Sequence, residues 1–278
     1  MFSGDLGRYN SPVMHDPAAI TRADVLLVES TYGDRNTHLN DPEAELARVV
    51  NEAVERGGVL VIAAFALGRT QTLLYYLKKL RAEGRVPMVP VYVDSPMGTR
   101  VSDLYPRHPT AHRLGHGNVL DFSGMHIIAE AWKSKALNHR LGPSIIISGS
   151  GMCTGGRILH HLSHHLPKPE DTLLLIGYQA EGTRGRQLQD GEPAVKIFGQ
   201  MVPVRCQIER LDGFSAHADC QELLRWLGQF REPPKRTFVV HGEPAAAEAL
   251  ARAMREQLGW ANVKVPDYLE TEVLFDGL

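Results

Sequence analysis

Short apolar runs alternate with amphipathic stretches along most of the chain. The stretch at 41–58 begins with an aspartate and a proline and ends in glycine, and the stretch at 67–84 also ends in glycine, which is typical of helices. A third helical stretch is predicted at 244–259. Runs with the length and polar borders of buried strands lie at 23–30, 58–65, 89–96, 143–151, 171–178 and 236–243. This alternation predicts an α/β fold with helices on both faces of the sheet layers.

One segment interrupts this alternation and suggests how the chain divides. Residues 101–142 contain several prolines and glycines and predict irregular or helical insertion material. We expect a discontinuous domain made of 1–34 and 200–278, with a second domain inserted at 35–199.

Composition narrows the class of protein. The 278 residues are 43% hydrophobic and 22% charged with a net charge of −2, so a nucleic-acid surface would have to be local. No apolar run approaches the ~20 residues that span a membrane, and we expect no signal peptide. Cys153, Cys206 and Cys220 form no C-x-x-C pair, which predicts reduced thiols and a cytoplasmic location.

Four polar residues lie at predicted strand ends or in the loops beside them. Asp5 follows the opening "MFSG", which reads as the end of a buried strand, Glu29 ends "LLVE", and His241 ends "FVVH". His217 lies in "GFSAHAD", just before a helix. Taken singly, each carboxylate could cap a turn, His217 could be an ordinary residue at a helix start, and His241 could be structural. Taken together, they predict convergence at one sheet edge, and Asp5 and His241 are suitable zinc ligands.

Three loops have the composition of phosphate-binding segments. The loop "SGSGMCTGGR" at 148–157 offers glycines and backbone N–H groups, although a simple tight turn is an equally good interpretation. The loops at 65–74 and 177–188 add arginines, whose guanidinium groups bind phosphate in a bidentate manner. The residues predicted to bind substrate phosphate are Arg69, Ser148, Ser150, Arg184 and Ser215.

The histidine-rich stretch "HHLSHH" at 160–165 has helical spacing but no carboxylate or cysteine among its histidines. We interpret it as a partly exposed helix face, and not as a metal site.

Read together, these motifs resemble the RNA-processing nucleases that have a metallo-β-lactamase fold and a β-CASP domain. "FSGDLG" is similar to the fourth lactamase motif, and "VESTYGDR", "GFSAHAD" and "VVHGE" are similar to the three β-CASP motifs. "FALGRTQ", "VYVDSPM", "SGSGMCTGGR" and "GYQAEGTRGRQL" add to the likeness, which covers essentially the whole chain in order. The resemblance implies a partial metallo-β-lactamase αββα sandwich with an inserted α/β β-CASP domain.

The resemblance also implies residue roles. Asp5 would bridge two zinc ions, His241 would be a terminal zinc ligand, and His217, oriented by Glu29, would be the catalytic acid or would steady the phosphate. The expected activity is zinc-dependent hydrolysis of single-stranded RNA, by endonuclease or exonuclease cleavage or both. The partner besides RNA would be a second copy of the chain or a related β-CASP subunit, and no membrane is involved.

The family's H-x-H-x-D-H motif does not occur in the sequence. We therefore expect the back portion of a longer enzyme, with an incomplete zinc site and no activity by itself, since catalytic zinc usually has three protein ligands. The alternatives are a non-catalytic RNA-binding or scaffold partner of an active nuclease, and a small-molecule phosphate-binding protein. Retention of Asp5, Glu29, His217 and His241 disfavours the scaffold alternative.

Overall fold

The computed structural model describes residues 1–36, 41–115 and 120–274. The chain forms two compact units, and each is described by itself. The first unit contains Met1–Ser11, His15–Leu39 and Ala216–Leu278, and the second contains Pro12–Met14 and Asn40–Ser215. One unit is thus inserted into the other, while the domain boundaries drawn from the sequence, at 34/35 and 199/200, stay a prediction.

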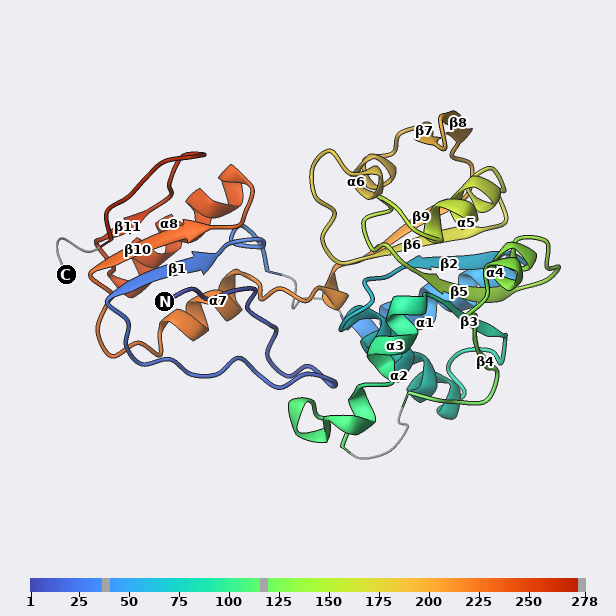
Figure 1. The fold of residues 1–278 in the computed structure, drawn as a ribbon, viewed down its shortest axis with the longest axis horizontal. Coiled ribbons are helices and arrows are strands. Elements are labelled where there is room, and N and C mark those ends of the chain that lie inside the picture. Colours follow the sequence, from blue (N-terminus) through green and yellow to red (C-terminus); the bar gives the residue numbers. More distant parts are fainter. Residues whose placement is uncertain (37–40, 116–119, 275–278) are drawn as a thin grey trace. The chain divides into compact units, whose positions relative to one another are not determined.

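The second unit is built around a six-stranded parallel sheet with the order β4-β3-β5-β2-β6-β9 (Figure 1). Its strands are β2 (Val59–Ala63), β3 (Val91–Asp94), β4 (Met125–Ile127), β5 (Ser144–Ser148), β6 (Thr172–Ile176) and β9 (Gln207–Leu211), and an antiparallel pair is formed by β7 (Ala194–Ile197) and β8 (Gln200–Pro203). Its helices are α1 (Pro42–Glu55), α2 (Arg69–Ala82), α3 (Pro96–Ser102), α4 (Ala131–Leu137), α5 (Ile158–His165) and α6 (Arg184–Gln189), with 3₁₀ turns at Tyr105–Arg107, Pro109–Ala111 and Asp212–Phe214.

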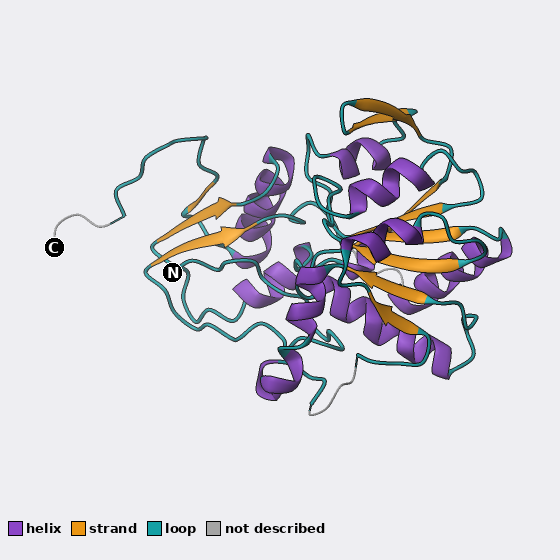
Figure 2. Ribbon diagram, turned by 45° about the vertical axis from the view of Figure 1, so that its right-hand side comes forward, coloured by secondary structure: helices purple, strands orange, loops and turns teal. Residues whose placement is uncertain are grey.

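Helices cover both faces of this sheet, as Figure 2 shows, and the alternation of side chains along the strands explains why. Leu60 and Ile62 of β2 belong to one core cluster with residues of α1 and α2. Val59 and Val61 belong to a second cluster with residues of α4, α5 and α6. Because both faces of the sheet are buried, its central strands are continuous apolar runs in the sequence. This is why these strands could be predicted.

The first unit has a three-stranded parallel sheet and two helices. The sheet order is β1-β10-β11, formed by β1 (Val25–Glu29), β10 (Arg236–Val240) and β11 (Val263–Lys264). Both α7 (Cys220–Leu227) and α8 (Pro244–Leu258) contribute to the core cluster that contains Leu26 of β1 and Val239 of β10. The α/β class with parallel sheets is therefore confirmed.

The opening residues differ from the buried strand that the sequence suggested. Phe2 makes one bridge to Leu27 on the free edge of β1, flanked by backbone hydrogen bonds from Ser3 N to Leu27 O and from Leu27 N to Met1 O. The Phe2 side chain is nevertheless 73% exposed. An edge position with side chains alternating between two faces does not bury an apolar residue unless another layer covers it, and none does so among the described residues.

Two expectations from composition can also be compared with the structure. All three cysteines are free, with Cys153 and Cys206 buried. Burial raises the pKa of each of these two thiols to about 12, so they are protonated and unreactive in the folded state. In the part of the chain that the structure describes, no helix combines the length and apolarity needed to cross a membrane.

A buried polar network ties the carboxyl end of β3 to α4 and α5. The Asp94 carboxylate accepts hydrogen bonds from Arg157 Nη1 and Ser134 Oγ, each at 2.6 Å, and lies 2.6 Å from His161 Nε2. His161 Nδ1 lies 2.7 Å from Asn138 Oδ1. Burial by itself would raise the pKa of Asp94, but the hydrogen bonds from His161, Ser134 and Arg157 outweigh burial and lower the pKa below its usual value.

We predict that Asp94→Asn lowers the free energy of unfolding by about 3–5 kcal/mol, because it leaves buried positive and donor groups without a charged partner. Since the folded-state pKa is lowered, the carboxylate stabilises the fold above its unfolded pKa, and this contribution is lost as the pH falls through the folded value, below about pH 4. Urea denaturation of both proteins between pH 3 and 7 measures both effects.

The matched control is Asp190→Asn, which removes an exposed ion pair of 3.0 Å with Arg186 on α6. Its expected cost is about 0–1 kcal/mol. Equal costs for the two substitutions would contradict a stabilising role for the Asp94 network.

Candidate metal centre

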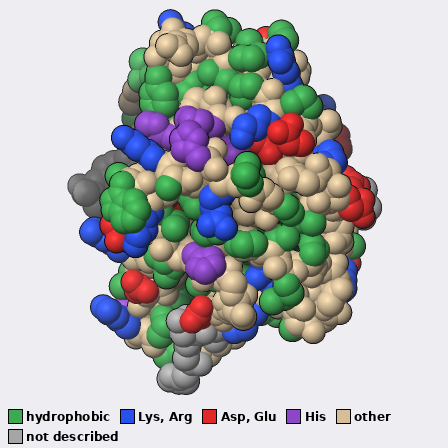
Figure 3. Space-filling view, turned by 90° about the vertical axis from the view of Figure 1, so that its right-hand side faces the viewer, with side chains coloured by type: hydrophobic (Ala, Val, Ile, Leu, Met, Phe, Trp, Pro, Cys, Tyr) green, Lys and Arg blue, Asp and Glu red, His purple; other side chains and the backbone are tan. Residues whose placement is uncertain are grey.

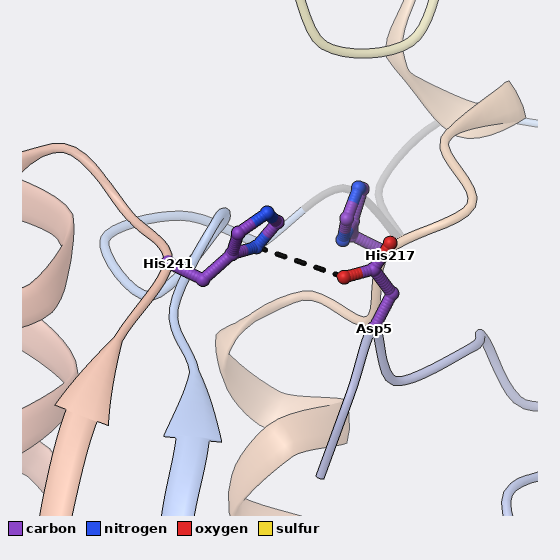
Figure 4. A group of neighbouring side chains, drawn as sticks. All are labelled: Asp5, His217 and His241. Carbon is purple, nitrogen blue, oxygen red and sulfur yellow. Dashed lines mark ion pairs between the residues drawn. The ribbon is translucent and has the colours of Figure 1, made fainter. Parts of the chain in front are cut away.

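Three side chains from distant parts of the sequence meet in the first unit. One donor atom each from Asp5, His217 and His241 lies within 4.8 Å of the others (Figure 4). His241 Nδ1 is 3.7 Å from Asp5 Oδ1, and the rings of His217 and His241 have centroids 5.9 Å apart. The predicted convergence of these three residues is therefore present in the structure.

The local backbone places Asp5 and His241 at this point. Asp5 follows Gly4, whose φ of +61° turns the chain away from the edge of β1. His241 comes directly after β10 and has a φ of +55°, and Thr31 Oγ1 donates a hydrogen bond to its carbonyl at 3.2 Å. Gly242 must be glycine, because a Cβ there would lie 2.3 Å from Ser30 Oγ. The chain after β10 can thus pass close to the end of β1 and bring His241 to Asp5.

The carboxylate of Glu29 contacts the imidazole of His217, in agreement with the orienting role that the family resemblance implies. Glu29 ends β1 with a side chain that is 1% exposed, and its two carboxylate oxygens lie 3.0 and 3.1 Å from His217 Nδ1. The same carboxylate accepts from Leu6 N at 2.6 Å and from Thr31 N at 3.3 Å. Because an ionised carboxylate only accepts, His217 Nδ1 carries a proton, and Nε2 becomes the atom able to bind a metal or transfer a proton.

The donor set suits a zinc ion. One carboxylate and two imidazoles are the ligand types of catalytic zinc sites, which generally use three protein ligands. The side chains of Asp5 and His241 are 66% and 60% exposed, so the centre is open to solvent. The sequence assigned only Asp5 and His241 as ligands, and the structure adds the imidazole of His217 to the same cluster. A carboxylate partner such as Glu29 is also the usual support of a zinc-bound histidine.

The residues predicted to bind phosphate all belong to the second unit. The loops at 65–74, 148–157 and 177–188 follow β2, β5 and β6, whose carboxyl ends share one edge of the parallel sheet. Arg69 begins α2, behind Gly68 with a φ of +76°. This edge is where open α/β sheets bind ligands, so the placement of the three loops agrees with a binding surface.

The serines among them are engaged in the fold. Ser148 is fully buried and donates to the carbonyl of Asp94 at 3.0 Å. Ser150 Oγ accepts from Thr154 N at 3.0 Å and from Gly155 N at 3.3 Å, which shapes the glycine-rich loop. Ser215 is 4% exposed at the end of a 3₁₀ turn. Their contact with phosphate stays a prediction.

Arg184 also has a structural role that its sequence context did not reveal. Its Nε and Nη2 donate to the carbonyl of Lys196 at 2.9 and 2.7 Å, and Nη1 donates to the carbonyl of Cys153. The guanidinium thus connects α6 with β7 and the glycine-rich loop, and phosphate binding by Arg184 stays a prediction.

The histidine-rich helix α5 has two different faces. His160 and His164 are exposed, whereas His161 and His165 are buried, where His165 Nδ1 lies 2.6 Å from Asp171 Oδ2. Figure 3 shows histidine side chains gathered on one surface of the molecule. The exposure of His160 and His164 agrees with the interpretation of α5 as a partly exposed helix face.

Reasoning from sequence missed a group of residues beside the metal centre. Arg8, Asp219 and Glu222 form hydrogen bonds and ion pairs next to His217. The pattern D-x-x-E at the start of a helix is a capping-box signal and could have identified Asp219 and Glu222. The local sequence gives no indication that Asp219 or Glu222 interacts with Arg8.

Comparison with known proteins agrees with this geometry. Residues 70–188 match the Beta-Casp domain, and residues 201–266 match the Zn-dependent metallo-hydrolase RNA specificity domain. The chain belongs to the β-CASP metallo-hydrolase family. The α/β fold of both units is consistent with this family, and the zinc dependence in the second description agrees with the ligand types gathered at Asp5, His217 and His241.

Several curated β-CASP relatives align with most of the chain. It is 38% identical to a ribonuclease of Thermus thermophilus over 91% of this chain and 59% of the relative. It is 30% identical to transcription termination factor FttA of Methanosarcina mazei, over 93% of this chain and 43% of the relative. It is 31% identical to an RNase J-like protein of Methanocaldococcus jannaschii, over 97% of this chain and 63% of the relative. The chain thus spans less than two thirds of each of these relatives.

We predict that His241→Ala and His217→Ala separate metal binding from proton transfer. The prediction applies to a full-length form of the enzyme in which further ligands complete the zinc site. There, His241→Ala lowers zinc content and activity together, whereas His217→Ala lowers turnover and keeps most of the zinc. Metal analysis of the purified proteins, combined with RNA cleavage rates, measures both.

The matched control is His164→Ala, which removes an exposed histidine of α5 in the other unit. Equal loss of zinc from the two site variants would contradict the separate roles and would make His217 a ligand.

Proposed function

We propose that this protein is a zinc-dependent RNA hydrolase that cleaves phosphodiester bonds. The observation that supports the proposal most strongly is the convergence of Asp5, His217 and His241, with His217 held by the Glu29 carboxylate, in a chain of the β-CASP family. The Thermus thermophilus relative is a ribonuclease, and the domain matched at 201–266 is described as an RNA specificity domain.

The protein's own residues supply two functions at this centre. Asp5 and His241 provide ligands of the types that hold zinc, and bound zinc lowers the pKa of water and polarises a phosphoryl oxygen. His217, held through Nδ1 by Glu29, presents Nε2 as a general acid for the leaving oxygen. Glu29 keeps the imidazole in one orientation and stabilises its protonated form, as the carboxylate of a catalytic triad does.

The full two-zinc site of the family is part of the proposal. Asp5 as a bridging ligand and His241 as a terminal ligand leave most positions of two metal ions to be filled by further ligands. We therefore expect that the 278-residue chain by itself does not cleave RNA and that additional ligands complete the site.

The substrate class and setting follow from the same reasoning. We propose single-stranded RNA as the substrate, bound partly through the loops at the carboxyl edge of the sheet in the second unit. The free cysteines support a cytoplasmic location. Pairing with a second copy or with a related β-CASP subunit stays a prediction, which sedimentation analysis can test.

The experiment uses the endogenous protein, purified from its own cells, with a labelled single-stranded RNA. We expect bound zinc, cleavage that stops when a chelator removes the metal, and recovery of cleavage when zinc is added back. Its intact mass, compared with 30.8 kDa, also tests whether additional chain completes the site. RNA binding without cleavage by the zinc-loaded protein would contradict the proposal and favour the non-catalytic scaffold.

We predict that Arg69→Ala weakens RNA binding and lowers the slope of log K against log salt by about 0.7, the value for one phosphate contact on a single strand. Fluorescence anisotropy over a range of salt concentrations measures the slope.

The control is Arg48→Ala, which removes an exposed arginine of α1 paired with Glu52 and Glu209. It should leave the slope unchanged. The same slope for wild type and Arg69→Ala would exclude Arg69 from the phosphate contacts.

A further inference from the structure

Two short segments of the first unit run side by side and position two residues of the metal centre. One segment contains Asp5 and Leu6, and the other contains His217 and Ala218. Ala218 N donates to Leu6 O at 2.8 Å, and Gly7 forms an antiparallel bridge with His217. The register between these segments therefore determines where the Asp5 carboxylate lies relative to the imidazole of His217.

Glu29 fixes this pair of segments on one side. Its carboxylate accepts from Leu6 N and lies within hydrogen-bonding distance of His217 Nδ1, so it contacts both segments at once. The two segments are joined by few backbone hydrogen bonds. If Glu29 were the only side chain that contacted both, one segment could still shift in register relative to the other.

Glu222 contacts the same two segments on the other side. Its Oε1 accepts from Tyr9 N at 2.9 Å, and its Oε2 accepts from Asp219 N at 3.1 Å and from Arg8 Nε at 3.2 Å. The side chain is 3% exposed. The contact with Asp219 belongs to the capping box of α7, whereas the contacts with Arg8 and Tyr9 go beyond helix capping and reach the segment that contains Asp5.

Arg8 completes this arrangement. Its side chain is 12% exposed, and its Nη2 lies 3.8 Å from Asp219 Oδ2 while its Nε donates to Glu222. A guanidinium can serve two carboxylates at once because its donors are spread over a rigid plane. Arg8 thus bridges both acidic residues of the α7 capping box.

We infer that Glu222, assisted by Arg8, is a positioning residue for the metal centre, because it holds the segment of Asp5 in register with the segment of His217. Glu222 acts through the backbone of the two segments, where it accepts from Tyr9 N and Asp219 N. The effect of Glu222 on metal binding rests on the proposed function. The register between the two segments, in contrast, is a property of the metal-free chain.

The chemistry of Glu222 explains why a glutamate is needed. Its carboxylate accepts from at least Arg8 Nε, Tyr9 N and Asp219 N, and two oxygens with about four acceptor positions can accommodate several donors at once. A glutamine offers one acceptor oxygen, and its NH₂ group would face an N–H donor. Glu222→Gln therefore disturbs the contact with little change in size, whereas Arg8→Ala leaves the contacts of Glu222 with Tyr9 and Asp219 in place and should have the smaller effect.

The first measurement is amide hydrogen exchange of the metal-free protein. In Glu222→Gln we expect exchange at Leu6 and Ala218 to become about tenfold faster or more, with no change at Val239 in β10, because only the local register is loosened. Arg8→Lys, which retains the charge, should exchange more slowly at these amides than Arg8→Ala does.

The second measurement is a titration with Co²⁺, followed by visible absorption. We expect Glu222→Gln to weaken Co²⁺ binding about tenfold or more, which is the usual effect of losing a residue that supports metal ligands. The control is Glu43→Gln, which removes a partly buried carboxylate paired with Lys79 and Arg85 in the second unit, and which should change neither measurement.

The outcomes distinguish the inference from the proposed function. Unchanged exchange at Leu6 and Ala218, or faster exchange throughout the first unit with a lower melting temperature, overturns the positioning role and leaves Glu222 as an ordinary stabilising residue. If the wild-type protein purified from its own cells, with the ligands that complete the site, binds no Co²⁺, the metal site of the proposed function fails, and the exchange measurement still decides whether Glu222 sets the register.

Discussion

The candidate metal centre depends on one buried charge, the carboxylate of Glu29. An ionised group that is 2% exposed is tolerated in a protein interior only when hydrogen bonds replace its water, and Glu29 obtains them from Leu6, Thr31 and His217. Those donors lie on three different segments of the first unit. The requirement to solvate one carboxylate thus brings the loop after Asp5 and the loop with His217 to the end of β1.

The same constraint operates in the second unit with a different result. Asp94 is also buried at the carboxyl end of a parallel strand, and its partners Ser134, Arg157 and His161 come from α4, the glycine-rich loop and α5. There the network is closed, since His161 is fully buried and its second nitrogen meets Asn138. The network around Glu29 instead ends in His217, whose side chain is 18% exposed, next to two residues that face solvent. The two networks thus differ in the exposure of their histidine. The buried His161 can only stabilise the fold, whereas the partly exposed His217 can reach a ligand.

Much of the fold could be predicted because the strands at the centre of the larger sheet are buried on both faces. Strands such as β2 and β5 appear in the sequence as continuous apolar runs. The sequence did not predict the two strands at the edges of that sheet. Strand β4 is three residues long and mostly exposed, and β9 contains the charged residues Glu209 and Arg210, so neither is a continuous apolar run. The convergence of Asp5, His217 and His241 could be predicted because polar residues at strand ends and in the loops beside them are visible in the sequence. The structural role of Arg184 could not be predicted, because its partners are the backbone carbonyl groups of Lys196 and Cys153, which come close to it only after folding.

The pairing of β1 with β10 has a consequence for how the protein forms. All five residues of β1 pair with β10, and Asn40–Ser215 of the second unit lies between the two strands in the sequence. Contacts between distant parts of a chain incur a large loop-closure entropy and form slowly. During synthesis, β1 leaves the ribosome long before its partner exists, while the second unit already has every strand of its own sheet. His217 and Asp5 are therefore brought together in the last stage of folding, after the inserted unit has brought its two ends together.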